Sequence, residues 1–365
     1  MHPGVRSSKA ELDYVKQRIL AGAEPWTSEL AQLRRSSRLQ GAPLALRRLD
    51  SRGPEAQVAQ DDALATYSLA LLWYYSGEEA IARKALAHLN AWSAFEAFTA
   101  GTDQDKLQAA WLGSVLAPAA EIMRLHPGWK PAEIASLQSM FRRVFYPQLA
   151  TPSTWNGNVD LTQIDAWLGL AVFNDDAEAF DAALLRFQRR LPAYIYLRTD
   201  GVLPQSIVGD GGDVRRFWFE PVRWVDGLTQ ETCRDNGHHA QFGLGSALHI
   251  AETAWHQGVD LYTPNAPRFI AALELLATQL LHGSMQGLTR KDEASKSLFD
   301  VWEIGLSHYE GRARVRLPMT RRLVIEQVRV RAERESCNLS RATLTHGELP
   351  RGLCSGACLR SVDSS

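Results

Sequence analysis

The residues best able to do chemistry are concentrated in a ten-residue run, 230–239. Five of its members can donate, accept or transfer protons: Arg234, Asp235, Asn236, His238 and His239. So many polar groups exceed what ordinary packing needs, and they stand at the start of a predicted helix, where the backbone favours negative charge. The run therefore predicts a site for an acidic ligand. The alternative is a structural pair between Arg234 and Asp235 beside histidines whose hydrogen bonds are satisfied.

Two shorter motifs add candidates. In residues 155–158, Asn158 could donate a hydrogen bond to a carboxylate as a neutral group, although Asn158 and Asp160 are also natural caps for a helix predicted to start at Leu161. In residues 302–309, Tyr309 could act as a phenolic acid or base. A packing residue with a hydrogen-bonded hydroxyl is the other interpretation of Tyr309.

A metal site is not predicted. His249, Glu252 and His256 fall near one face of a predicted helix, but their spacing differs from the pair of histidines four residues apart found in zincins. We therefore expect a polar stripe between helices. The chain contains four Cys, and none forms a CxxC pair.

Helical periodicity dominates the elements that must position these residues. Predicted helices pair with a return helix across a short break, and alternating runs of β-branched residues are nearly absent. The pairs are 62–73 with 78–92, 161–173 with 177–190, and 241–256 with 266–281. The fold is therefore predicted to be all-α, and periodicity alone leaves a solenoid, a bundle or a closed α/α toroid open.

Two segments depart from this pattern. Residues 197–226 form a long stretch rich in Gly and Asp, and a connection of that length is more often functional than idle. The region from Arg312 onward is rich in arginine, which predicts a solvated face followed by a disordered tail.

Composition limits the function classes. The 40 basic and 41 acidic residues give a formal net charge of -1, which argues against a nucleic-acid binder. No apolar run is long enough to cross a membrane, and residues 1–4 do not begin a signal peptide.

Taken together, several motifs resemble the alginate-lyase-like polysaccharide lyases. The most specific stretch runs from Glu231 to Tyr262, and the likeness extends over nearly the whole chain. The other matching segments are 2–4, 22–26, 90–92, 119–122, 155–158, 193–196, 302–303 and 343–346. One departure is Val159, which stands where relatives often have Trp and could alter a surface for sugar stacking.

The resemblance implies an all-α fold, an α/α toroid or incomplete helical barrel built from helical hairpins. It would occupy residues 1–335 as a single domain, with a poorly ordered tail over 336–365. It also implies β-elimination on an acidic uronate polymer of the alginate or glucuronan type, without a cofactor or metal. The expected partner is an acidic polysaccharide, with no nucleic acid or membrane, and the family points to a periplasmic or secreted location.

Matching positions give the expected roles. Asn158 and Arg234 would hold the substrate carboxylate, with Trp155 and Asn156 as further substrate-binding residues. His238 would neutralise the carboxylate or act as base, His239 is an alternative base, and Tyr309 is the candidate general acid or base.

Two other functions remain open from the sequence. A glycoside hydrolase on a similar toroid would need two carboxylates flanking the bond. Its candidates surround the long segment: Asp213, Glu220, Asp226 and Glu231. The third hypothesis is a catalytically inactive carbohydrate-binding protein.

Overall fold

The structure is a computed structural model that describes residues 1–299 and 301–329. Helices account for nearly all of its regular elements, and the two named strands, β1 (Arg48–Leu49) and β2 (Ala97–Phe98), form one short parallel pair. The prediction of an all-α fold is confirmed. The predicted tail, 336–365, lies outside the described residues, and the single domain over 1–335 stays a prediction.

Four helical hairpins form the body of the molecule. Each joins an inner helix to an outer one. The inner helices are α3 (Glu55–Ser76), α5 (Asp103–Met123), α8 (Gly157–Phe173) and α11 (His238–His256). The outer helices are α4 (Glu79–Trp92), α6 (Pro131–Met140), α9 (Ala177–Arg190) and α12 (Tyr262–His282).

The inner helices pack in chain order, α3 on α5, α5 on α8 and α8 on α11. Because each inner helix meets neighbours on both sides and at least one outer helix, it is buried around most of its circumference. The outer helix α9, by contrast, has one apolar face. This arrangement is the predicted α/α toroid.

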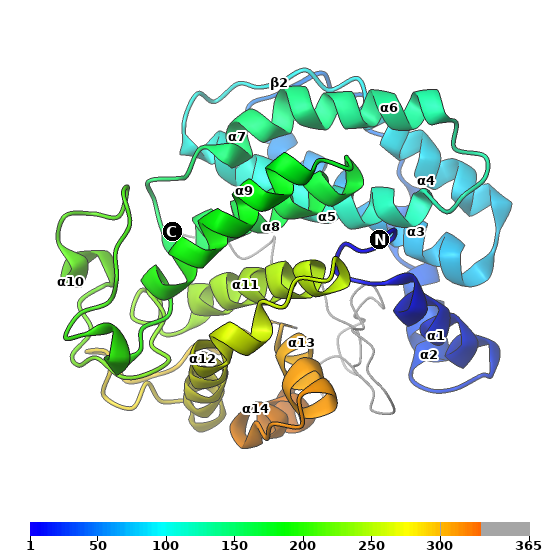
Figure 1. Cartoon of the computed structure of the whole chain (residues 1–365). Helices are drawn as coiled ribbons and strands as arrows, with labels where there is room; N and C mark the ends of the chain where they lie inside the picture. The colour runs from blue at the N-terminus through cyan, green and yellow to red at the C-terminus, as the bar shows by residue number, and fades with distance from the viewer. Residues whose placement is uncertain (300, 330–365) are drawn as a thin grey trace.

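Shorter helices complete the molecule. Figure 1 shows α1 (Lys9–Leu20) and α2 (Trp26–Arg34) together beside the lower end of α3 and α4. On the side of α11 away from α8 and α9 lie α12, α13 (Trp302–Leu306) and α14 (Pro318–Leu323). The remaining α-helices are α7 (Tyr146–Ala150) and α10 (Val214–Phe217). The short 3₁₀ helices are η1 (Ser37–Gln40), η3 (Leu191–Ala193) and η4 (Arg198–Asp200). The short π-helices are η2 (Phe141–Phe145), η5 (Ser307–Arg312) and η6 (Val324–Val328).

Helix α8 begins earlier than predicted. Its N-cap is Asn156, so Asn158 and Asp160 lie inside the first turn, and the prediction that they cap the helix is wrong. The reason is that side chains from another segment satisfy the first backbone donors. The N–H of Gly157 donates to Gln230 Oε1 at 3.0 Å, and the N–H of Asn158 donates to Glu231 Oε2 at 3.2 Å.

Asp160 instead forms buried ion pairs with two arginines of α9, Arg186 and Arg190. Arg190 also binds Asp210 at 2.9 Å, which fastens the long segment 197–226 to the hairpin. Further along that segment, the Phe219 ring lies 5.9 Å from the guanidinium carbon of Arg234, which precedes the start of α11.

The arginine-rich C-terminal region is less solvated than expected. Arg312 pairs with Glu252 of α11 and so connects the last described helices to the body of the protein, whereas Arg321 pairs with Glu310 and Arg329 with Glu303 among those helices. The prediction of a solvated face is wrong for Arg312 and Arg329, whereas the Arg321 side chain is 42% exposed. Arg331 and Arg334 lie outside the described residues.

Candidate functional site

A groove of about 700 Å³ opens where α5, α8 and α11 meet. Six of the seven predicted site residues line it: Trp155, Asn156, Asn158, Arg234, His238 and His239. Its other walls come from Gln104, Leu107, Trp111, Val159, Thr162, Asp235, Phe242, Ser295 and Ser297. The structure thus brings together two motifs that lie far apart in the sequence, 155–158 and 230–239.

Arg234 is held between two partners at the edge of the groove. Its Nη1 donates to Glu231 Oε1 at 3.1 Å. With the Asn156 amide oriented to satisfy both of its neighbours, the amide oxygen accepts from the same Nη1 at 2.8 Å. The guanidinium side chain remains 30% exposed, so a fixed positive charge faces the groove.

Glu231 lies beneath the groove and is fully buried. Burial raises its pKa to about 7, against the opposing effect of Arg234. Its Oε2 accepts from the Asn158 N–H and, at 3.2 Å, from the Tyr194 hydroxyl. Glu231 therefore connects the N-terminus of α8 to Arg234 and orients both.

Two glycines make room for Tyr194 to reach this position. A β-carbon at Gly243 would lie 1.9 Å from the Tyr194 hydroxyl, and one at Gly157 would lie 2.5 Å from its ring. Both distances are far inside van der Waals contact, so α8 and α11 approach the tyrosine only because these positions carry no side chain.

Asn158 contributes a polar group with spare hydrogen-bonding capacity. The residue is 7% exposed, and its Oδ1 is buried without a hydrogen-bond partner. An unpaired buried polar atom normally destabilises a protein, and such atoms concentrate where a ligand completes the hydrogen bonding. Asn158 lines the groove, so its amide is available to a substrate there.

The two histidines stand side by side in the first turn of α11. His239 pairs through Nδ1 with Asp235, whose other oxygen accepts the His239 N–H at 2.9 Å. Burial raises the pKa of Asp235, but the hydrogen bonds from His239 outweigh it and leave the pKa below its usual value. An anionic Asp235 fixes the ring and leaves Nε2 as the nitrogen available for proton transfer.

His238 is positioned by aromatic neighbours. Its ring contacts Phe242 and Phe299, with centroid distances of 5.7 Å and 5.1 Å, and the His239 ring lies 5.3 Å away. Two imidazoles therefore border the same part of the groove as the carboxylate-binding candidates.

The structure places Tyr309 away from the groove, and its role as general acid or base stays a prediction. Tyr309 lies in η5, is 1% exposed, and donates its hydroxyl to the Tyr262 carbonyl oxygen at 3.4 Å. It packs against Tyr262 and His308 and does not line the groove. This position favours the interpretation as a packing residue with a hydrogen-bonded hydroxyl, and none of the residues lining the groove is a tyrosine.

Sequence reasoning missed the supporting residues. From the sequence, Glu231 is a candidate only as a hydrolase carboxylate, and Asp235 is a member of the polar run or a structural partner of Arg234. In the structure Glu231 orients Arg234 and Asp235 orients His239. Their position inside the 230–239 run was the available signal. Trp111 and Thr162 gave no signal, because each looks like an ordinary residue of a buried helix.

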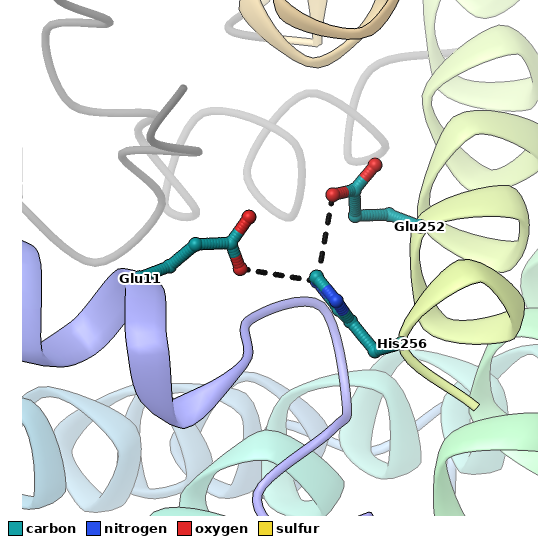
Figure 2. A group of neighbouring side chains, drawn as sticks. All are labelled: Glu11, Glu252 and His256. Carbon is teal, nitrogen blue, oxygen red and sulfur yellow. Dashed lines mark ion pairs between the residues drawn. The ribbon is translucent and has the colours of Figure 1, made fainter. Parts of the chain in front are cut away.

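A second polar cluster lies at the other end of α11. Figure 2 shows Glu252 and His256 on α11 facing Glu11 on α1. His256 Nε2 lies 3.1 Å from Glu11 and 3.4 Å from Glu252. These three side chains have the types of metal ligands, but Arg312 Nη2 already contacts both carboxylates, at 2.9 Å and 2.5 Å. The arginine supplies the positive charge, so the cluster is an ion-pair network.

His249 belongs to neither cluster. Its Nδ1 lies 3.4 Å from Asp165 of α8. The expected polar stripe along α11 is therefore divided between two separate sets of partners.

Comparisons with known proteins agree with this geometry. A sequence model of the family described as alginate lyase matches residues 6–284, most of the chain. The chain belongs to the alginate lyase family. By family, the chain is therefore a polysaccharide lyase. A search of curated proteins found no match.

Solved alginate lyases share the fold of this family member. The A1-III enzyme of Sphingomonas species A1 is 16% identical, with a TM-score of 0.62 over 85% of this chain and 92% of that one. A variant of A1-III complexed with a tetrasaccharide is 17% identical, with a TM-score of 0.62 over 84% and 86% of the two chains. An alginate lyase from Bacteroides ovatus is 15% identical, with a TM-score of 0.61 over 88% and 96%.

No helix in the described part of the chain is long and apolar enough to span a membrane.

Proposed function

We propose that this member of the alginate lyase family cleaves an acidic uronate polymer, of the alginate or glucuronan type, by β-elimination. The observation that carries the proposal is the meeting of Asn158, Arg234, His238 and the Asp235–His239 pair in one groove. The tetrasaccharide held by the A1-III variant indicates a ligand of the same general kind. The family also supports a periplasmic or secreted location.

The reaction first requires the substrate carboxylate to be neutralised. β-Elimination removes the proton at C5 of a uronate, and the resulting charge spreads onto a carboxylate that is already negative. Glu231 fixes the Arg234 guanidinium and the backbone N–H of Asn158 in advance, so Arg234 and the nearby Asn158 side chain can stabilise that charge with little reorganisation. The protein supplies this stabilisation from its own side chains, and the proposal therefore requires no cofactor.

Two proton transfers complete the elimination. His239 accepts the C5 proton at Nε2, and Asp235 stabilises the imidazolium that forms. A double bond forms between C4 and C5 as the bond from C4 to the glycosidic oxygen breaks. His238 enters the reaction protonated and donates its proton to the departing oxygen. His238 thus takes the role of general acid that the sequence predicted for Tyr309.

The groove favours this chemistry over hydrolysis. A glycoside hydrolase needs two carboxyl groups facing the bond. Among the lining residues only Asp235 carries a carboxylate, and His239 engages it. Of the other sequence candidates, Glu231 is buried beneath the groove, and Asp213, Glu220 and Asp226 do not line it.

The test is an activity screen on alginate, glucuronan and neutral glucans, followed by ultraviolet absorbance of the unsaturated product. We expect absorbance to rise with at least one polyuronate and with no neutral glucan. Reducing ends without the chromophore would point to hydrolysis. Binding of oligouronates without any product would point to an inactive carbohydrate-binding protein.

A further inference from the structure

A smaller cavity of about 50 Å³ adjoins the groove. Trp111, Thr162 and Phe242 line both, so these three side chains form the boundary between the two spaces. The inner walls of the small cavity are Arg6, Ser114, Val115, Asp165, Gly245, Ser246, His249 and Val301. A volume of this size admits one or two water molecules or a single substituent of a sugar, and it cannot hold a sugar ring.

Arg6 reaches this cavity from the N-terminal segment. Its N–H donates to Thr253 Oγ1 at 3.2 Å, which anchors the backbone on α11, and its Nη2 pairs with Asp165. The residue is 8% exposed, yet its Nε and Nη1 are buried without a hydrogen-bond partner. Buried guanidinium donors without acceptors are costly, and a bound acceptor would remove that cost.

The charges around Arg6 permit an anion. Burial raises the pKa of Asp165, but the Arg6 charge and the contact with His249 outweigh it and keep the pKa below its usual value. Asp165 is therefore ionised and already paired with Arg6. The unpaired Nε–H and Nη1–H groups can each donate a hydrogen bond to a carboxylate oxygen.

We propose that this cavity is a second carboxylate-binding subsite, in which Arg6 holds the acid group of a uronate next to the one that reacts. The sugar ring would remain at the boundary between Trp111 and Phe242, where aromatic side chains can pack against its face. The inference rests on the proposed uronate substrate, and it adds a residue that recognises a second acid group without taking part in proton transfer.

The experiment measures binding instead of turnover. A His239→Ala background slows cleavage enough for binding to be measured, and calorimetry compares a tetrauronate with the same oligosaccharide after its carboxyl groups are reduced to alcohols. We expect Arg6→Met to weaken binding of the acidic ligand roughly tenfold or more, and to leave the neutral ligand unaffected.

A second variant tests the subsite independently, in case Arg6→Met does not fold. Ser114→Val places methyl groups in the cavity and leaves the Arg6–Asp165 pair intact, because the Ser114 hydroxyl bonds only to the Trp111 carbonyl oxygen at 3.0 Å. It too should weaken binding of the acidic ligand. Ser136→Val, at an exposed serine of α6 with a similar hydroxyl-to-carbonyl bond, is the matched control and should not.

Unchanged affinity for the tetrauronate in both Arg6→Met and Ser114→Val would overturn the subsite, even if the wild type proves to be an active lyase. Loss of affinity in both variants, with no unsaturated product from the wild type, would keep the subsite and refute the lyase reaction. Failure of the parent to bind any oligouronate would refute both.

Discussion

The two ends of helix α11 carry similar residue types and use them differently. At its start, His238 and His239 border the groove, and the Asn158 amide beside them has an oxygen without a partner. At its end, Glu252 and His256 are enclosed by Glu11 and Arg312. Residue type therefore does not distinguish the candidate site from the structural network. What distinguishes them is whether other side chains of the protein already pair with the polar groups.

The closed cluster has few unsatisfied acceptors to offer. Glu252 accepts from Arg312 through both oxygens and from the Tyr262 hydroxyl at 2.7 Å, and Ser8 donates to Glu11. Such a network fixes α1 and η5 to α11 and is sensitive to loss of a member. The groove cluster keeps donors and acceptors available, as a site for a charged ligand requires.

The largest expected effect separates the two histidines. His239→Ala should lower kcat on the polyuronate by roughly 10²- to 10⁴-fold, because it removes the proposed base, and should leave thermal unfolding nearly unchanged. His256→Ala, at the far end of the same helix, should lower the unfolding temperature and leave kcat nearly unchanged. Rates measured beside melting curves check both. A stability loss in His239→Ala as large as its rate loss would remove the distinction.

Breaking the closed cluster comes next. Glu252→Gln leaves the Arg312 guanidinium without its main counter-charge, so we expect the free energy of unfolding to fall by about 3–5 kcal/mol. Denaturant titration measures this, and kcat at a temperature where the variant is folded should match the wild type. Unaltered stability would mean that Glu11 alone holds Arg312.

The buried carboxyl group beneath the groove should make stability depend on pH. The pKa of Glu231 is about 7 when folded, above its ordinary value of 4.5, so between these values the folded state binds more protons than the unfolded state. Its contribution is fully present below pH 4.5 and is lost as pH rises through 7, a difference of about 3 kcal/mol. Glu231→Gln should remove this contribution, which unfolding at a series of pH values detects. Parallel curves for the two proteins would contradict the assignment.

The smallest effect concerns Tyr309. Tyr309→Phe removes one long hydrogen bond, so we expect a loss of about 0.5–1.5 kcal/mol in unfolding free energy and an unchanged rate. A large loss of kcat with native stability would return Tyr309 to the reaction and would sharpen the question of which group protonates the leaving oxygen.

Local patterns predicted the fold better than the site. The hairpins could be predicted from apolar periodicity, and Gly77, with φ of 72°, ends α3 within the break predicted between residues 73 and 78. The closure of the hairpins into a toroid came only from the resemblance, since periodicity describes one helix at a time and not its neighbours. The start of α8 was misplaced because its first donors are satisfied by Gln230 and Glu231, more than 70 residues away.

For the site, the dense polar run was sufficient to find Arg234, His238 and His239, because so many polar groups rarely gather in one short stretch unless a ligand or an ion-pair network satisfies them. The motif that suggested Tyr309, residues 302–309, carries no information about which way the helix faces. Arg6 had no distinguishing pattern at all. Its importance depends on contacts with α8 and α11 that no local stretch of sequence describes.

The packing around Tyr194 has a consequence for engineering. Replacing glycine by alanine within a helix ordinarily strengthens that helix by reducing the freedom of the unfolded chain. At Gly157 and Gly243 the same change would push the tyrosine ring away from Glu231 and, through it, shift the guanidinium of Arg234. A search for thermostable variants that treats these positions as ordinary helix sites would therefore gain helix propensity but displace Arg234 from its position at the groove.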